Sequence, residues 1–233
     1  MIAYLLSAGN GMRLRPVTDN FQKCLLPVNG KPMLEYWLDA VFGSWLFQKV
    51  CVNVHHCAGD VERWLAGYFE RTGHSVKIID ERANLLGTAG TLFEHGDRDQ
   101  DFMLAYTDTY SDHVFKNLST IALHWASNNN DGMVGGLISF PSPKDKSAGA
   151  MVIDSVGVVK AFNEKSDNGD VVWAGVMFAR KIFYDYMTPF DKDIARDVMP
   201  RLANKLRVIS HVEAYDIGRG VECYQQFARA KTA

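Results

Sequence analysis

The chain has 233 residues, a formal net charge of −2, 47% hydrophobic residues and 22% charged residues. This length is enough for one well-buried domain, and the mixed charge argues against a nucleic-acid-binding surface or a polybasic membrane patch. No apolar run approaches the ~20 residues that span a bilayer, and the N-terminus has neither the basic start nor the long apolar core of a signal peptide. The four cysteines form no dense framework. We therefore expect a cytoplasmic protein with no membrane or nucleic-acid partner.

Apolar runs and helical patterns alternate through the first half of the chain. Strands are predicted, in chain order, at residues 2–6, 49–54, 75–79 and 102–106. Helices are predicted between them at 32–42, 60–69 and 88–95, and a further helix at 118–127. This alternation is typical of right-handed βαβ units on a largely parallel sheet.

The second half has a different pattern, with several strands joined by short connections. Strands are predicted at 133–139, 150–153, 156–162, 171–178 and 206–210, and helices at 193–203 and 222–230. Asp154-Ser155 is typical of a hairpin turn, which adds antiparallel pairing. We therefore expect an α/β fold, Rossmann-like, with a central sheet that is mixed but mostly parallel and has helices on both faces.

The turn after the first strand is rich in small residues. Gly9 and Gly11 would let backbone N–H groups approach phosphate oxygens, and Arg13 and Lys23 would add positive charge beside the β- and γ-phosphates. The turn is not a Walker loop, because no Gly-Lys-Ser/Thr follows, and it lacks the third glycine of the dinucleotide fingerprint. A glycine turn after a strand often binds nothing, so it is the added charges that predict a nucleoside triphosphate here.

Residues 4–36 resemble the N-terminal signature of the sugar-1-phosphate nucleotidyltransferases. That signature is Gly-x-Gly-Thr-Arg-Leu-x-Pro, followed by Pro-Lys-Pro, Leu-Pro-Val and Lys-Pro-Met. The residues kept here are Gly9, Gly11, Arg13, Leu14, Pro16, Lys23, Pro27, Lys31, Pro32 and Met33. The chain departs from the signature at Met12, where the family has threonine, and at Gln22 and Cys24, which stand in place of the prolines beside the lysine.

Later motifs follow in the order that the family shows. They are Leu86-Gly87-Thr88-Ala89-Gly90, Thr107-Asp108, Phe162-Asn163-Glu164-Lys165, Trp173-Ala174-Gly175 and Tyr215-Asp216-Ile217-Gly218. The resemblance thus covers residues 2 to about 220. It implies the nucleotide-diphospho-sugar transferase fold in a single domain, 1–233, with a nucleotide-binding half at about 1–112 and a sugar-phosphate-binding half at about 113–233.

The reaction that this resemblance implies joins a sugar 1-phosphate to the α-phosphorus of a nucleoside triphosphate. It requires positioning and charge neutralisation, with no protein nucleophile, and Mg²⁺ held by one or two carboxylates suits it. Asp108 follows a strand end, where open α/β sheets bind their ligands, although an aspartate there could also be a turn or N-cap residue. The resemblance adds Asp216 as the second carboxylate, so both are expected to be Mg²⁺ ligands.

The resemblance also assigns the remaining site residues. Those expected to act in the chemistry are Arg13, Lys23, Asp108 and Lys165. Those expected to contact the nucleotide are Ala8, Gly9, Gly11, Met12, Arg13, Lys23, Glu81, Gly87 and Thr88. Those expected to contact the sugar phosphate are Gly149, Glu164, Lys165 and Gly175. A solvated charged pair is the alternative for Glu164 and Lys165, and a core position is favoured for Trp173 over stacking on the acceptor.

The loop from Leu86 to Gly90, with Glu81 before it, most resembles that of guanylyltransferases that make GDP-mannose or GDP-heptose. An acidic side chain can accept two hydrogen bonds from the guanine edge, so GTP is expected first, then UTP or dTTP, then CTP with phosphocholine as acceptor. A non-catalytic regulatory subunit of the same fold is the competing interpretation, and the retained charged residues argue against it. The resemblance implies a role in cell-surface glycan synthesis and is compatible with a homo-oligomer.

Overall fold

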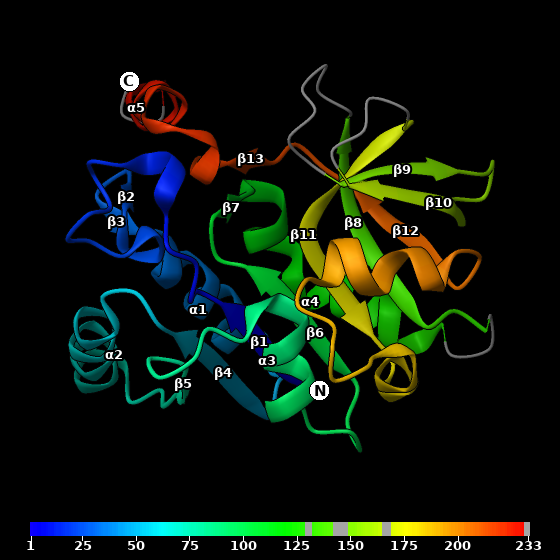
Figure 1. Ribbon diagram of the computed structural model, residues 1–233, viewed down its shortest axis with the longest axis horizontal. Helices are drawn as coiled ribbons and strands as arrows, with labels where there is room; N and C mark the ends of the chain where they lie inside the picture. Colours follow the sequence, from blue (N-terminus) through cyan, green and yellow to red (C-terminus); the bar gives the residue numbers. More distant parts are fainter. Residues whose placement is uncertain (129–131, 142–148, 165–168, 231–233) are drawn as a thin grey trace.

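A mixed β-sheet runs through the molecule, shown in Figure 1 as a computed structural model that describes residues 1–128, 132–141, 149–164 and 169–230. Within these ranges the sheet has nine strands in the order β10-β9-β11-β6-β1-β4-β5, with β8 paired to β11 and β12 paired to β8. The strands are β1 (Ile2–Leu6), β4 (Lys49–Val54), β5 (Lys77–Asp80), β6 (Phe102–Tyr106), β8 (Gly135–Pro141), β9 (Gly149–Ile153), β10 (Val159–Glu164), β11 (Val171–Ala179) and β12 (Leu206–His211).

The two halves of the sheet differ in strand direction. Strand β1 lies parallel to both β4 and β6, and β4 lies parallel to β5. Strand β11 then pairs antiparallel with β6, β8 and β9. The prediction of a mixed α/β sheet, with parallel pairing first and antiparallel pairing later, is confirmed.

Helices cover both faces of the sheet, as the alternation of side chains along β1 requires. Ala3 and Leu5 belong to the core under α1 (Met33–Gly43), α2 (Ala58–Thr72) and α4 (Asp112–Ser127). Tyr4 belongs to the opposite core, which contains α3 (Gly87–His95) and the short helical turns between 181 and 202. In the described ranges no helix is long and apolar enough to cross a membrane.

Two small antiparallel pairs lie beside the main sheet. Strand β2 (Pro27–Val28) pairs with β3 (Lys31–Pro32), and β7 (Thr109–Tyr110) pairs with β13 (Tyr215–Asp216). In Figure 1, β13 lies beside β7, and the chain continues from β13 to the last helix, α5 (Val221–Ala230). The β7–β13 pair brings residue 216 beside residue 109, across more than 100 residues of sequence.

The predicted helix at 193–203 is wrong in type. The structure has a π-helical turn at Ile194–Val198 followed directly by a 3₁₀ turn at Met199–Leu202. Pro200 lies in the second turn, and because proline has no N–H and its ring clashes with the preceding turn, a regular α-helix cannot pass through it.

Two other elements begin three or more residues away from their predicted starts. Helix α4 begins at Asp112 instead of 118, because the Ser111 hydroxyl caps it by accepting a hydrogen bond from Val114 N–H at 3.4 Å. Strand β10 begins at Val159 instead of 156, because the Asp154 carboxylate accepts hydrogen bonds from the N–H groups of residues 156 and 158 and so lengthens the predicted hairpin turn.

Candidate active site

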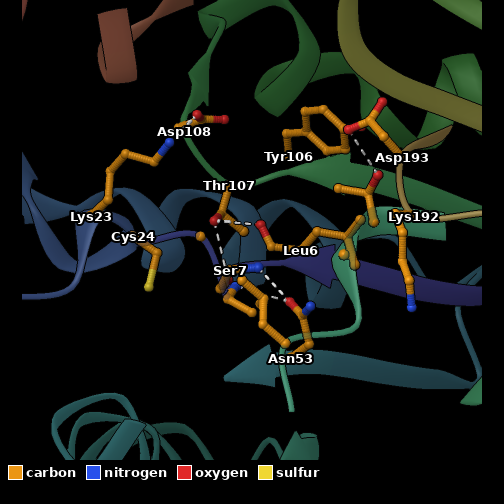
Figure 2. A pocket seen from close by; sticks show the side chains of 15 residues that line it. Leu6, Ser7, Lys23, Cys24, Asn53, Tyr106, Thr107, Asp108, Lys192 and Asp193 are labelled. Carbon is orange, nitrogen blue, oxygen red and sulfur yellow. Dashed lines mark hydrogen bonds and ion pairs between the residues drawn. The ribbon is translucent and has the colours of Figure 1, made fainter. Parts of the chain in front are cut away.

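A cavity opens at the carboxyl ends of β1, β4 and β6, and Figure 2 shows the side chains around it. The hydroxyls of Ser7 and Thr107 lie 3.1 Å apart, and the Asn53 side chain reaches the backbone after β1. We call this the first cavity. It is lined by Leu6, Ser7, Ala8, Gly9, Lys23, Cys24, Asn53, Leu85, Gly87, Thr88, Tyr106, Thr107, Asp108, Lys192 and Asp193.

A second cavity lies against the first. It is lined by Arg13, Tyr106, Asp108, Thr109, Phe140, Trp173, Ala174, Gly175, Asp193, Ala195, Ala214, Asp216 and Arg219. Tyr106, Asp108 and Asp193 line both cavities, so two ligands seated in them would meet beside these three side chains.

One lysine and two aspartates converge where the cavities meet. Lys23 forms an ion pair with Asp108, and Figure 2 shows the two side chains pointing at each other. A methyl group built on Gly218 would lie 2.8 Å from Lys23 Nζ, 2.9 Å from Asp108 Oδ2 and 3.0 Å from Asp216 Oδ1. All three charged groups therefore surround the Cα of Gly218, and any side chain there would displace them. Arg13 approaches from the second cavity, 3.9 Å from Asp216 Oδ2.

The two carboxylates have opposite pKa shifts. Burial acts to raise the pKa of Asp108, but the adjacent Lys23 ammonium outweighs it and holds that pKa below its ordinary value. Burial and then the neighbouring Asp108 carboxylate raise the pKa of Asp216. Because ionised Asp216 is disfavoured beside Asp108, a further cation between the two carboxylates would stabilise the site.

This donor set fits Mg²⁺. Asp108 lies in the turn between β6 and β7, and Asp216 lies in β13. Both supply hard oxygen ligands, and the glycine at 218 adds no side chain between them. In the described residues no group of three histidine, cysteine or acidic side chains could form a complete protein cage. Mg²⁺ characteristically uses one or two carboxylates, keeps several waters and takes its other ligands from substrate phosphates.

The phosphate-binding turn predicted after β1 is only partly exposed to the first cavity. Ala8 and Gly9 line it, and a methyl group on Gly9 would meet no atom within 4 Å. Gly11 does not line the cavity. It has a φ of +62°, and its carbonyl accepts a hydrogen bond from the Thr18 hydroxyl at 2.7 Å, so it helps to fix the conformation of the turn. Met12 is 66% exposed and lines neither of the two cavities. Its contact with a nucleotide stays a prediction.

Gly87 and Thr88 form the far wall of the first cavity, where α3 begins. Gly87 has a φ of +80°, and a methyl group there would overlap the carbonyl oxygen of Lys192. That carbonyl accepts a hydrogen bond from Ala89 N–H at 3.1 Å, and the Thr88 hydroxyl accepts one from Ile194 N–H at 2.9 Å. The loop before α3 is thereby fastened to the segment at 192–194, which carries the Lys192 side chain into the cavity wall opposite Lys23 (Figure 2).

Glu81 lies outside the residues that line the first cavity. Its side chain is 2% exposed, and its carboxylate accepts hydrogen bonds from Asn53, from Thr91 and from Leu86 N–H. The structure gives this carboxylate a role within the protein, and a direct contact with a base stays a prediction.

Three of the four predicted sugar-phosphate residues, Gly149, Glu164 and Gly175, lie on the antiparallel half of the sheet. Gly175 lines the second cavity with a φ of +71°, and a methyl group there would lie 3.0 Å from the Tyr106 ring. Gly149 and Glu164 are paired across β9 and β10. Lys165 lies outside the described residues.

Trp173 is both a core residue and part of the second cavity. It is 5% exposed, its indole N–H donates to the Val176 carbonyl at 2.8 Å, and its ring meets Tyr106 edge-on. The expected core position is confirmed, and the ring edge also forms part of the cavity wall.

Sequence reasoning missed Asn53, Lys192 and Asp193 as cavity residues. Asn53 had a readable signal, since a lone amide at the end of the apolar run Lys49–Val54 is buried and must find partners. Lys192 and Asp193 carried no such signal, because their place depends on how the segment after β11 returns to α3.

Comparisons with known proteins agree with this geometry. The family model "Nucleotidyl transferase" matches residues 2–218. A UTP–glucose-1-phosphate uridylyltransferase of Synechocystis is 26% identical over 97% of this chain and 62% of its own length. A probable mannose-1-phosphate guanylyltransferase of Oryza sativa is 26% identical over 91% of this chain and 59% of its own. An N-acetylmuramate α-1-phosphate uridylyltransferase of Caulobacter vibrioides is 37% identical over 38% of this chain and 37% of its own. The chain thus spans less than two thirds of the length of these curated relatives.

Solved structures show the same fold. A putative glucose-1-phosphate thymidylyltransferase from Bacillus anthracis superposes with a TM-score of 0.81 at 16% identity, covering 100% of this chain and 95% of that one. A UDP-glucose pyrophosphorylase from Acinetobacter baumannii gives a TM-score of 0.78 at 13% identity, covering 98% and 92%. Because the family model matches nearly the whole sequence, this chain belongs to the nucleotidyl transferase family.

Proposed function

We propose that this chain transfers a nucleotidyl group from a nucleoside triphosphate, GTP first, to a sugar 1-phosphate, releasing pyrophosphate and forming a nucleotide sugar for cell-surface glycans. The observation that carries the proposal is the convergence of Lys23, Asp108 and Asp216 at the junction of the two cavities. Two phosphorylated substrates that meet there would bring together several negative charges, which is the problem that such a cluster solves.

Mg²⁺ bound by Asp108 and Asp216 would neutralise charge that develops on the phosphates during in-line attack. The protein's own residues do the rest. Lys23 lines the first cavity beside Asp108 and is placed to bind the phosphates of the nucleotide. Arg13, expected from the sequence to lie beside the nucleotide phosphates, lines the second cavity and not the first. From there it can donate to an acceptor phosphate. Burial of the carboxylates keeps these charges away from bulk solvent, where they would be weaker.

The proposed base preference is supported by the far wall of the first cavity. Lys192 forms no ion pair that involves the described residues, and its ammonium can only donate hydrogen bonds. If this donor faces the O6 edge of guanine or the O4 edge of uracil and thymine, it favours those bases over adenine and cytosine, which carry an amino group at that position. The guanylyltransferase of Oryza sativa and the uridylyltransferase of Synechocystis both use bases that carry such an oxygen.

A second candidate acceptor follows from the aromatic side chains of the second cavity. Tyr106, Phe140 and Trp173 all line it, and aromatic faces bind quaternary ammonium groups as well as the apolar faces of sugars. Phosphocholine is therefore a specific alternative to a sugar 1-phosphate.

The test is pyrophosphate release in the presence of Mg²⁺. GTP, UTP, dTTP, CTP and ATP are each combined with mannose 1-phosphate, heptose 1-phosphate, glucose 1-phosphate and phosphocholine. Release with GTP and a sugar 1-phosphate is expected, and release that is confined to CTP and phosphocholine would favour the second candidate. Nucleotide binding by calorimetry without release from any pair would contradict both.

A further inference from the structure

A continuous series of buried hydrogen bonds runs beneath the first cavity, from its phosphate end to its base end. It begins at Gln22, which is fully buried and stands where the family has proline. The Gln22 side chain accepts a hydrogen bond from Lys23 N–H at 2.6 Å and donates one to the Ser7 carbonyl at 2.7 Å. The backbone of Lys23 is thereby tied to the turn that follows β1.

Asn53 continues the series from the other side of the same turn. Its amide oxygen accepts hydrogen bonds from Ser7 N–H at 2.6 Å and from Ala8 N–H at 3.2 Å. Two N–H donors cannot face an NH₂ group, so the orientation of the amide is fixed and its nitrogen must point the opposite way. It donates there to Glu81 Oε1 at 2.9 Å.

Glu81 completes the series at the base end. The same oxygen accepts from the Thr91 hydroxyl, and the second oxygen accepts from Leu86 N–H at 3.1 Å. Thr91 lies on α3 and also contacts the Gly87 carbonyl at 2.9 Å. The carboxyl group is buried and forms no ion pair within the described residues, so these hydrogen bonds hold it in position.

We propose that Asn53 and Glu81 are positioning residues that hold the turn after β1 at a fixed distance from the loop before α3, so that the first cavity keeps the width of a nucleotide. Glu81 acts through Asn53 and the Leu86 backbone, without touching the base. The proposal rests on the proposed function, because it assigns the first cavity to the nucleotide. A purely structural pair would affect folding alone, whereas a positioning pair affects nucleotide binding more than acceptor binding.

An exchange of amide and carboxylate between the two positions tests this directly. Asn53→Asp still accepts from the turn, but it sets a second carboxylate against Glu81. Glu81→Gln alone presents an NH₂ group either to Asn53 or to Leu86 N–H, and so loses one contact. In the double variant the aspartate at 53 can accept from the new amide, and the amide oxygen can accept from Leu86 N–H, so the complementarity returns.

Nucleotide affinity is measured by calorimetry with Mg-GTP, or with Mg-UTP if the unmodified chain turns over UTP. The KM of each substrate is measured by pyrophosphate release. Each single variant is expected to weaken nucleotide binding about tenfold, because it loses one buried charged hydrogen bond. The nucleotide affinity of the double variant should lie within about threefold of that of the unmodified chain. The acceptor KM should change far less. The matched controls Asn117→Asp on α4 and Glu94→Gln on α3 make the same chemical changes outside the series and should leave both constants unchanged.

The proposal would be overturned by a double variant no better than the singles, or by single variants that lower the melting temperature and leave the nucleotide constants unchanged. If Asn53→Asp fails to fold, Thr91→Val decides, because it removes one hydroxyl from the series at nearly constant volume. A rise of about threefold in the nucleotide constant then supports the proposal, and no change overturns it. Absence of pyrophosphate release from the unmodified chain would contradict the proposed function alone, since nucleotide binding would still test the series.

Discussion

Replacement of Gly87 by alanine should damage the first cavity in a way that the structure allows to be estimated. The residue has a φ of +80°, where a non-glycine residue costs about 1–2 kcal/mol. The new methyl would also lie well under 3.0 Å from the backbone carbonyl oxygen of Lys192, and a backbone atom cannot move aside as a flexible side chain can. Overpacking of this kind costs about 1–3 kcal/mol, so the whole penalty is about 2–5 kcal/mol.

Gly73→Ala is a matched control. Gly73 ends α2 with a φ of +74°, and a methyl group there would meet no atom within 4 Å. It carries the backbone penalty without the collision, and the entropy that alanine removes from the unfolded chain is the same in both variants. In a chain of this size 1 kcal/mol shifts the melting temperature by about 2–4 °C, so Gly87→Ala should melt about 2–12 °C below Gly73→Ala.

The assays are thermal unfolding of both variants and the KM for the nucleotide. Relief of the collision requires the segment at 192–194 to move away from α3, which widens the base end of the first cavity. We therefore expect the nucleotide KM of Gly87→Ala to rise about tenfold or more, as the loss of about 1.4 kcal/mol would produce, with little change in the acceptor KM. Equal melting temperatures for the two variants, together with an unchanged nucleotide KM, would refute the reasoning.

Four further substitutions test the assigned charges. Asp108→Asn should lower turnover on the order of 10³-fold in a folded protein, because a metal site supplies several kcal/mol of charge stabilisation. A near-normal rate with unchanged Mg²⁺ dependence would show that Asp108 is not a metal ligand. Asp216→Asn should also abolish Mg²⁺-dependent turnover, yet stabilise the metal-free protein. The folded pKa of Asp216 is raised, so its ionised form destabilises the fold at neutral pH, and the gain should vanish in melting curves below pH ~3.9, the unfolded value. Lys192→Ala should raise the KM for GTP or UTP about three- to tenfold, the value of a partly exposed charged hydrogen bond, with no rise for CTP; an equal rise for every nucleotide would contradict a base contact. Lys165→Ala should chiefly raise the KM for the sugar 1-phosphate, and an unchanged KM would return Lys165 to a solvated surface role.

The order of strands and helices could be predicted from the sequence because it depends on local patterns. The run Ile2–Leu6 alternates between two cores, and the glycines and prolines mark where elements end. The two-residue strands Thr109–Tyr110 and Tyr215–Asp216 could not be found this way, because each exists only by pairing with the other. The irregular turns at 194–202 likewise follow from tertiary packing around Pro200 more than from the local pattern.

The site was predictable to different depths. Lys23 and Asp108 follow from charge and from position at strand ends, and the structure brings them into contact. The role of Asp216 rested on the resemblance to a family, since only the long-range pair with β7 places it near the lysine. In the sequence, Gln22 is marked only as a departure from the family signature, with no indication of its structural role. A glutamine at this position could lie in an exposed turn or be buried, and the sequence does not distinguish the two. Only the fold shows that its side-chain amide accepts a hydrogen bond from Lys23 N–H and donates one to the Ser7 carbonyl.

The pairing of β13 with β7 also has a consequence for how the protein is made. Chains emerge from the ribosome from the N-terminus, and domains begin to fold during synthesis. The strands that form the floor of the first cavity are complete by residue 106, yet the second carboxylate, Asp216, follows Asp108 by more than 100 residues. A nascent chain can therefore assemble β1, β4 and β6 with Lys23 and Asp108 in place while it lacks Asp216 altogether. The two carboxylates proposed to bind Mg²⁺ can therefore come together only after the segment that contains β13 has been made, more than 100 residues after Asp108.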